Sequence, residues 1–430
     1  MERLLIKGPV RLNGVVSIDG SKNAALPLLA ASILASQPLV LSNIPHLKDV
    51  TSMLELLGYL GVKFTIDEDM HLEVDSSNIS QYKVPYDLMK TMRASILVMG
   101  PMLARYGQAQ ISLPGGCAIG SRPVDLHFKA LEQMGVLIDI SDGYVNLRAP
   151  EGLTGADITF DVVTVTGSEN VIMAAVLARG TTILRNVAKE PEVVDLIRCL
   201  NMMGAKISGE GTATLMIEGV EELLGGYYQI IPDRIEAATF LIAAAMTQGK
   251  IKLEKVAPEH LEIVIDKLLE AGADIQQGKD WITLEMKRRP KAVDVTTGVY
   301  PDFATDVQAQ WVALNAVAEG SAVVKETVFE NRFMHVHELK RLGADLEVHG
   351  SRVISKGRKR LSAAPMKATD LRASASLVLA GLVSEGETSI ESIFHIDRGY
   401  AFIEEKLSRL GVNVCRVTLK PCEVPKDQVT

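Results

Sequence analysis

The amino-acid sequence predicts an α/β fold of two lobes, built from six repeated units whose central helices are buried. Three observations lead to this prediction. One motif recurs about every 70 residues, a second motif of small apolar residues recurs in the same register, and the 430 residues are 47% hydrophobic and 23% charged. This composition is ordinary for a globular protein and excludes a disordered chain.

The first motif is an amphipathic helix that ends in an apolar residue and a glycine, followed by a short strand. Successive glycines of this motif are 74, 69, 68, 71 and 68 residues apart. Glycine suits the position after a helix because it adopts positive φ without steric cost. The six glycines are Gly61, Gly135, Gly204, Gly272, Gly343 and Gly411.

The second motif is a helix with Ala and Leu on nearly every face, which indicates burial on all sides. A single unit with so few aromatic residues (5% overall) cannot bury such a helix alone, so the units must pack their helices together. The expected helices span 21–35, 92–106, 167–179, 234–248, 306–319 and 370–385. Five of the strands that follow are expected to open at Gly107, Gly180, Gly249, Gly320 and Gly386.

Two groups of three units fit this length. We expect the first lobe to span residues 22–231 and the second lobe to combine 1–21 with 232–430. The chain then crosses between the lobes twice, near 20–22 and near 232–233. Two crossings suit a clamp that closes on a ligand and excludes water.

Composition also narrows the partners and the location. A net charge of −8 and a pI near 5.6 argue against nucleic-acid binding. The apolar stretch 237–246 is far shorter than the roughly 20 residues of a membrane span. The four cysteines are scattered without zinc-site spacing, so we expect a reducing, cytoplasmic location and no metal. Oligomeric state stays open.

Charged residues recur at the starts of the buried helices. Helix N-termini attract anions, and Lys or Arg aimed into a cleft between two lobes forms a site for phosphate or carboxylate. The alternative is that each charged residue is a solvated cap. The residues at these starts are Lys22, Arg93, Arg234, Asp306 and Arg372.

A glycine-rich segment between a strand and a helix contains the most reactive candidate. Cys117 lies in PGGCAIGSRPVDLH (114–127), five residues before Arg122. A nearby cation favours the thiolate, which is the reactive form of cysteine. Cys199 lies in an amphipathic helix and is expected in the core. Cys415 and Cys422 are expected in a polar tail with no assigned role.

Asp306 stands in TDVQ (305–308) at the mouth of a buried helix. A carboxylate there serves either as an N-cap or as a general base. The sequence pattern alone leaves both alternatives open.

With these residues in view, the chain resembles the enolpyruvyl transferases, and among them the branch that acts on UDP-N-acetylglucosamine. The resemblance covers nearly the whole chain. It implies a six-fold, inside-out α/β barrel in two lobes, with no cofactor. It also implies transfer of the enolpyruvyl group of phosphoenolpyruvate to the sugar 3-hydroxyl with release of phosphate, the first committed step of peptidoglycan synthesis. The matching segments are 20–24, 114–127, 189–196, 232–240, 305–310, 329–336, 368–377 and 395–400.

The resemblance also implies roles for single residues. Cys117 matches the proton donor, which is the target of fosfomycin, and Asp306 matches the group that takes the hydroxyl proton. Lys22 and Arg398 are implied in catalysis as well as in binding. The phosphoenolpyruvate matches are Lys22, Asn23, Arg122, Arg372 and Arg398. The UDP-N-acetylglucosamine matches are Arg93, Arg122, Pro123, Val124, Asp125, Leu126, Thr164, Val165, Asp306 and Val328.

Two other functions remain as alternatives. The sister transferase that acts on shikimate 3-phosphate shares the fold and the donor, but it lacks the cysteine loop that Cys117 represents here. A non-enzymatic repeat scaffold would also explain repeated units. That alternative leaves the cations at the helix starts without a purpose.

Overall fold

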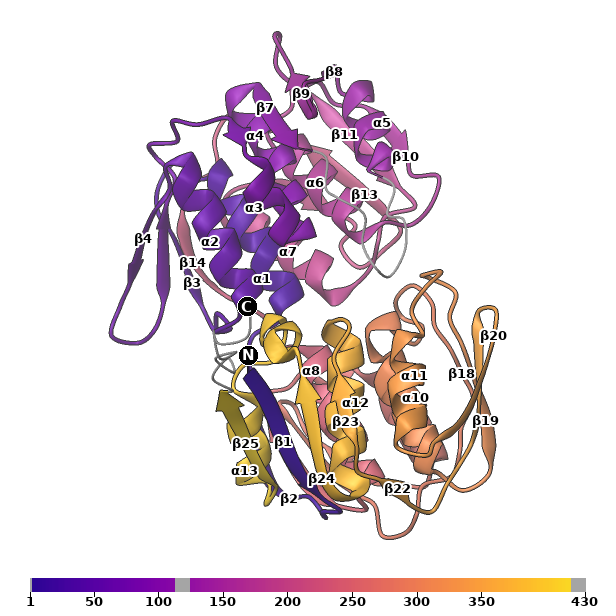
Figure 1. The fold of residues 1–430 in the computed structure, drawn as a ribbon. Helices are drawn as coiled ribbons and strands as arrows, with labels where there is room; N and C mark the ends of the chain where they lie inside the picture. The colour runs from indigo at the N-terminus through magenta and orange to yellow at the C-terminus, as the bar shows by residue number, and fades with distance from the viewer. Residues whose placement is uncertain (1, 113–123, 419–430) are drawn as a thin grey trace, which may run out of the picture.

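Two lobes, each with helices at its centre and sheets around them, make up the molecule (Figure 1). The computed structural model describes residues 2–112 and 124–418. Cys117, Arg122 and Pro123 lie outside the described residues, as does the tail that contains Cys422.

The small-residue motif forms the buried helices. In the second lobe, α8, α10 and α12 pack against one another, and nearly every residue of these helices is buried. The segments at 92–106 and 306–319 each begin as a 3₁₀ turn, η2 (Arg93–Val98) and η4 (Thr305–Val307). The buried helices are α1 (Lys22–Ala31, continued by η1, Ser32–Leu34), α4 (Met99–Tyr106), α6 (Val165–Ala175), α8 (Arg234–Met246), α10 (Gln308–Val317) and α12 (Leu371–Val383).

The expected strand starts need a correction. Four strands begin one residue after the glycine, and β24 begins at Ser384, two residues before Gly386. Gly107, Gly180 and Gly320 have φ of +68°, +89° and +102°. At these three positions a left-handed residue ends the preceding turn before the extended strand begins, which explains the one-residue offset. Gly386 differs, because it has φ of +113° and lies within β24.

The amphipathic motif forms helices that contact the buried helices, the sheet strands or both. All six glycines that follow them have positive φ, between +87° and +110°, which confirms the repeat. These helices are α2 (Lys48–Leu60), α5 (Asp125–Gln133), α7 (Pro191–Met202), α9 (Glu262–Glu270), α11 (Met334–Arg341) and α13 (Ile403–Arg409). The remaining short helices are α3 (Tyr86–Thr91), η3 (Pro258–His260) and η5 (Ile393–Arg398).

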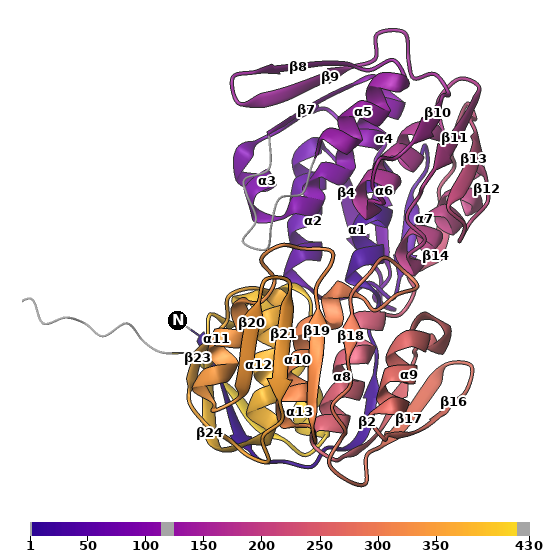
Figure 2. The same ribbon diagram turned by 90° about the vertical axis from the view of Figure 1, so that its right-hand side faces the viewer.

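The described strands form six sheets with one shared plan: a parallel pair, then two antiparallel strands. Figure 2 shows one of them, β18 to β21, on the outer face of the second lobe in front of α10 and α12. The first-lobe sheets are β14 (Gly226–Gln229), β3 (Leu39–Ser42), β5 (Leu72–Asp75), β4 (Lys63–Ile66); β6 (Lys83–Val84), β7 (Gln108–Ser112), β9 (Tyr144–Arg148), β8 (Leu137–Ser141); and β10 (Asp157–Thr159), β11 (Thr181–Arg185), β13 (Thr214–Glu218), β12 (Lys206–Ser208). The second-lobe sheets are β2 (Asn13–Ser17), β15 (Lys250–Glu254), β17 (Trp281–Glu285), β16 (Asp274–Gln277); β18 (Val295–Thr296), β19 (Ser321–Lys325), β21 (Arg352–Lys356), β20 (Asp345–His349); and β22 (Leu361–Ser362) with β23 (Pro365–Lys367), β24 (Ser384–Glu391), β1 (Glu2–Gly8), β25 (Asn413–Thr418).

Strands from distant parts of the chain complete these sheets. β1 lies between β24 and β25, and β2 pairs in parallel with β15. β14, at the end of the first lobe, pairs with β3 near its beginning. Cys415 therefore lies in a strand, opposite Leu5, and not in a polar tail as the sequence suggested. The pairing with β1 supplies the backbone partners that make residues 413–418 a strand.

The buried hydrophobic side chains form two clusters. The first contains residues between Ala24 and Ile230 together with Ala401, and the second combines Leu4 to Ile18 with Ile235 to Val412. Cys199 belongs to the first cluster and is fully buried, as predicted. None of the helices in residues 2–112 and 124–418 has both the length and the apolar character to cross a membrane.

Candidate active site

The starts of the buried helices meet between the two lobes, and side-chain caps fix several of them. Asp233 accepts hydrogen bonds from the backbone N–H groups of Ile235 (2.7 Å) and Glu236 (3.0 Å) at the start of α8. Asp370 does the same for two N–H groups at the start of α12, both at 2.9 Å. Because such caps satisfy the free donors of a first turn, they hold Arg234 and Arg372 at defined places.

Asp306 lies between two arginines of the second lobe. Its Oδ1 is 2.6 Å from Arg332 Nη2, and its Oδ2 is 3.0 Å from Arg372 Nη2. The two guanidinium groups are almost fully buried, whereas the Asp306 side chain stays 26% exposed. Burial acts to raise the pKa of Asp306, but Arg372 and Arg332 outweigh it and hold the pKa well below its usual range.

This geometry decides one alternative from the sequence. Within the described part of the chain, the side chain of Asp306 bonds arginines and caps no backbone N–H; the residue before η4 is Ala304, which offers no side-chain acceptor. The carboxylate is thus ionised and partly exposed. Arg332 was missed as a site residue, although it stands in the segment 329–336, because an arginine within a helix-entry turn has no distinctive spacing.

A second carboxylate joins the lobes. Asp49, in the first turn of α2, lies 3.1 Å from Lys22 Nζ and 2.8 Å from Arg398 Nε. Lys22 begins α1 of the first lobe, while Arg398 ends η5 of the second. Burial acts to raise the pKa of Asp49, but Lys22 and Arg398 outweigh it, so that the pKa is lowered overall. Asp49 was not predicted as a site residue, because an acidic residue in the first turn of a helix is an ordinary partner of the helix dipole.

The two clusters share one electrostatic environment. The positive charge of Lys22 is among the causes that lower the pKa of Asp306. The charge of Asp306 in turn helps to raise the pKa of Arg234, the first residue of α8. Charges influence one another this way only over short distances, so Lys22 and Arg234 both lie near Asp306.

A third contact between the lobes involves α7. Glu192 binds Arg234 with two hydrogen bonds, 3.0 Å to Nε and 3.2 Å to Nη2, and both side chains are largely buried. Nearby, Oε1 of Glu190 accepts a hydrogen bond from the backbone N–H of Tyr300 (3.4 Å) in the second lobe. Burial raises the pKa of Glu190. The first lobe therefore presents carboxyl groups to second-lobe donors at several points.

The other predicted residues divide into two groups. Asn23 follows Lys22 in α1, and Val328 donates its N–H to Glu326 (2.8 Å), whose second oxygen accepts from Thr305 beside Asp306 (2.8 Å). Both therefore lie close to the charge clusters. The remaining predicted residues lie at starts of first-lobe helices: Arg93 begins η2, Val124 precedes α5, Asp125 and Leu126 open α5, Thr164 caps α6, and Val165 begins it.

The chain crosses between the two lobes at Gly20 and Pro232. Gly20 pairs with Pro232, and the N–H of Ser21 donates to Ile231 O (2.7 Å). A Cβ on Gly20 would lie 1.8 Å from the carbonyl oxygen of Asn43, so only glycine fits there.

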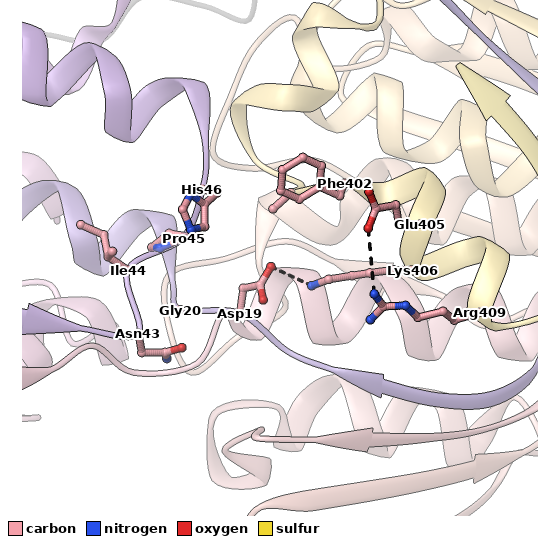
Figure 3. Close-up of a pocket in the computed structure, with 11 residues that line it drawn as sticks. Asp19, Gly20, Asn43, Ile44, Pro45, His46, Phe402, Glu405, Lys406 and Arg409 are labelled. Carbon is pink, nitrogen blue, oxygen red and sulfur yellow. Dashed lines mark hydrogen bonds and ion pairs between the residues drawn. The ribbon is translucent and has the colours of Figure 1, made fainter. Parts of the chain in front are cut away.

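A cavity of about 190 Å³ opens beside Gly20, where the chain crosses between the lobes (Figure 3). Lys406 Nζ lies 2.8 Å from Asp19 Oδ2 and also bonds Glu236, so α13 is tied to both crossing segments. The residues that line the cavity come from both lobes: Asp19, Gly20, Asn43, Ile44, Pro45, His46, Ala401, Phe402, Glu405, Lys406 and Arg409. Within residues 2–112 and 124–418, no three His, Cys, Asp or Glu side chains gather as metal ligands would.

Comparison with known proteins places this geometry in a family. The family model for EPSP synthase (3-phosphoshikimate 1-carboxyvinyltransferase) matches residues 6–407. A protein of Halorhodospira halophila named UDP-N-acetylglucosamine 1-carboxyvinyltransferase is 57% identical over 417 residues, which is 97% of this chain and 100% of the relative. A Coxiella burnetii protein of the same name is 56% identical over 419 residues, covering 97% of this chain and 96% of the relative.

Solved structures agree. The enolpyruvyl transferase NikO from Streptomyces tendae superposes with a TM-score of 0.87 at 26% identity, covering 97% of this chain and 99% of that chain. EPSP synthase from Acinetobacter baumannii has a TM-score of 0.76 at 17% identity over 97% of this chain and 100% of its own. At that identity the second match shows the fold alone.

Proposed function

The chain belongs to the enolpyruvyl transferase family, and on that premise we propose that it transfers the enolpyruvyl group of phosphoenolpyruvate to the 3-hydroxyl of UDP-N-acetylglucosamine, with release of phosphate. One observation carries the proposal: Arg372 bonds Asp306 and keeps it ionised, and Lys22, which also lowers the pKa of Asp306, shares the carboxylate of Asp49 with Arg398. The name shared by relatives more than half identical to this chain supports the choice of acceptor. A cytoplasmic location is part of the proposal.

The donor is a small acid with a phosphate and a carboxylate, so its site needs several cations. We assign this binding to Lys22, Asn23, Arg372 and Arg398, together with Arg122, which lies outside the described residues. Guanidinium groups suit the task because their planar forks match phosphate and carboxylate geometry. Asp49 neutralises Lys22 and Arg398 before the donor arrives, which keeps two like charges close without mutual repulsion.

The reaction needs a general acid and a general base in a site from which water is excluded. A proton delivered to the methylene carbon of phosphoenolpyruvate makes the neighbouring carbon electrophilic, and the 3-hydroxyl oxygen bonds to that carbon while its proton passes to Asp306. The tetrahedral adduct then expels phosphate as a proton leaves the new methyl group, which restores the double bond. We assign the proton donor to Cys117, outside the described residues, and the stabilisation of developing charge to the surrounding cations.

The sugar nucleotide is assigned to the helix starts of the first lobe and to the edge of the second. The first-lobe groups are Arg93, Val124 to Leu126, Thr164 and Val165, with Arg122 and Pro123 outside the described residues. Asp306 and Val328 face them from the second lobe. Lobe closure about the crossing at Gly20 would bring the two sets together and exclude water.

The test is a phosphate-release assay with purified protein. We expect phosphate from phosphoenolpyruvate when UDP-N-acetylglucosamine is present, and none when shikimate 3-phosphate replaces it. Turnover with shikimate 3-phosphate alone would favour the sister activity. Absence of phosphate release with either acceptor would leave only a binding scaffold.

A further inference from the structure

A single hydroxyl group lies where the three buried helices of the second lobe meet. Tyr400 follows η5 and is only 1% exposed. Its Oη lies 2.8 Å from Thr239 Oγ1 on α8, 3.3 Å from Gln310 Nε2 on α10 and 3.4 Å from Arg372 Nη1 on α12. One side chain thus connects all three helices directly behind the charge cluster.

The direction of each hydrogen bond follows from the groups available. The hydroxyl of Thr239 has one hydrogen, which it donates to the carbonyl of Ile235 at 2.8 Å. Thr239 can therefore only accept from Tyr400, so the Tyr400 hydrogen points at Thr239. The lone pairs of the Tyr400 oxygen are left for Arg372 Nη1 and for Gln310 Nε2, and Nε2 also reaches Thr239 Oγ1 at 3.1 Å. The amide of Gln310 is oriented independently, because its Nε2 also donates to the carbonyl of Asp306 (3.1 Å).

The hydroxyl thereby presents an acceptor to one end of a rigid cation. The guanidinium of Arg372 is planar, so a bond at Nη1 also fixes the place of Nη2. Nη2 lies 3.0 Å from Asp306 Oδ2, and the Arg372 side chain is 6% exposed. We propose that Tyr400 is a positioning residue: it orients Arg372 and, through Arg372, the carboxylate that takes the acceptor proton. This inference rests on the function proposed above.

Removing the hydroxyl would leave one buried donor, Arg372 Nη1, without its acceptor, whereas Gln310 Nε2 keeps Thr239 and the carbonyl of Asp306. In a Tyr400→Phe variant, Arg372 Nη1 loses its 3.4 Å contact in a place that water does not reach, and a buried unpaired donor is costly. The guanidinium must turn to find another partner, which moves Nη2 and with it Asp306. A displacement of about 1 Å in a reacting group lowers the rate by about 10²-fold.

The experiment measures steady-state kinetics of Tyr400→Phe in the full chain, with phosphoenolpyruvate and UDP-N-acetylglucosamine. We expect kcat to fall by about 10-fold or more. The KM for UDP-N-acetylglucosamine should change by less than about 3-fold, since Tyr400 itself touches no substrate and Asp306 is only one of several groups assigned to the sugar nucleotide. Thr239→Val, which removes the acceptor of the Tyr400 hydrogen and keeps the side-chain volume, should act in the same direction, and it replaces Tyr400→Phe if that variant does not fold.

A double-mutant cycle separates positioning from structure. Arg372→Lys keeps a positive charge but cannot bond Tyr400 and Asp306 with one rigid fork. If Tyr400 acts through Arg372, Tyr400→Phe should change kcat by less than about 2-fold in the Arg372→Lys background. Tyr228→Phe is the matched control, because it removes a hydroxyl that bonds Asp195 (2.7 Å) in the first lobe, and its kcat should match wild type.

The outcomes are distinct. Wild-type turnover with an unchanged kcat in Tyr400→Phe, or with effects of the two substitutions that simply add, would overturn the positioning role and leave the proposed function intact. No phosphate release by the wild-type protein would instead overturn the proposed function, and the positioning role with it. A low kcat for Tyr400→Phe, unaltered KM for the sugar nucleotide and non-additivity with Arg372→Lys together support the inference.

Discussion

The two lobes follow one repeat plan, yet they place their carboxylates in opposite ways at the cleft. In the second lobe, Asp306 bonds Arg332 and Arg372, both of the same lobe. In the first lobe, Asp49 and Glu192 bond arginines of the other lobe, Arg398 and Arg234. The arginines that bond Asp306 belong to its own lobe, whereas Asp49 and Glu192 bond arginines of the opposite lobe.

This difference assigns separate tasks to the lobes. A carboxylate held by two buried arginines within one rigid lobe keeps its geometry whatever the lobe angle, which suits the chemical step. Carboxylates that bond across the boundary instead influence how the lobes sit together. Substitutions in the two sets should therefore act on different quantities, rate in one case and stability of the contact in the other.

The largest effect is expected at Asp306. Asp306→Ala should lower kcat by about 10²- to 10⁴-fold, the contribution of a positioned general base. The measurement is phosphate release under saturating substrates, with circular dichroism to verify the fold. Asp274→Ala, which removes an exposed partner of Lys287 at 3.3 Å, is the surface control and should keep wild-type kcat. A kcat for Asp306→Ala within a factor of a few of wild type would exclude Asp306 as the base.

Replacing Asp49, which joins the two lobes, should lower the free energy of unfolding. Asp49→Asn leaves Lys22 and Arg398 without their shared counter-charge. Breaking a buried pair costs about 3–5 kcal/mol, and since the Arg398 side chain is 35% exposed we expect about 2 kcal/mol. Urea unfolding measures the loss. An unfolding midpoint equal to wild type would show that solvent already screens this contact.

Acid should weaken both lobes through one buried histidine in each. Burial lowers the pKa of His127 in the first lobe and of His335 in the second to about 4, below the ordinary 6.5. Between these values the unfolded chain binds protons that the folded chain does not, so stability is full above pH 6.5 and is lost as pH falls toward 4. Each histidine should contribute at most about 1.4 kcal/mol per pH unit.

Replacing either histidine by glutamine tests this symmetry. His127→Gln and His335→Gln should each flatten the dependence of unfolding free energy on pH between 6.5 and 4, measured by urea titration at several pH values. If only one variant flattens it, the two lobes differ in how they open at low pH. If neither does, burial of these rings does not control the acid response.

The smallest effect compares equivalent glycines of the repeat. Gly204 in the first lobe and Gly272 in the second have φ of +110° and +100°, and a Cβ at either would meet nothing within 4 Å. Only backbone strain then opposes alanine, at about 1–2 kcal/mol. Gly204→Ala and Gly272→Ala should lower the unfolding free energy equally. Unequal losses would show that the units do not carry equal strain.

The repeat was predictable because it depends on properties of neighbouring residues in the chain. Helices apolar on every face must be buried, and glycines such as Gly61 and Gly411 mark left-handed residues, as their φ values of +109° and +91° confirm. The position of β1 in its sheet could be predicted only in part from the sequence, since its pairing with β24 and β25 joins the two ends of the chain. The assignment of Cys415 to a tail failed for the same reason.

The candidate site shows the same limit. Lys22, Asp306, Arg372 and Arg398 were identified from helix starts and from resemblance. Asp49, Arg332 and Tyr400 were not, because each looks ordinary in its own segment and its role depends on partners in other segments. Arg332 bonds Asp306, 26 residues away, and Asp49 bonds Arg398, 349 residues away.

By itself, the sequence determined the repeat, the burial of the six helices and the presence of charge at their starts, because hydrophobic period, helix ends and glycine conformation act over a few residues. Only the tertiary structure decided which charges meet. Ion pairs and hydrogen bonds form between side chains within about 3 Å of one another, and in a chain of 430 residues that proximity is set by how the two lobes pack.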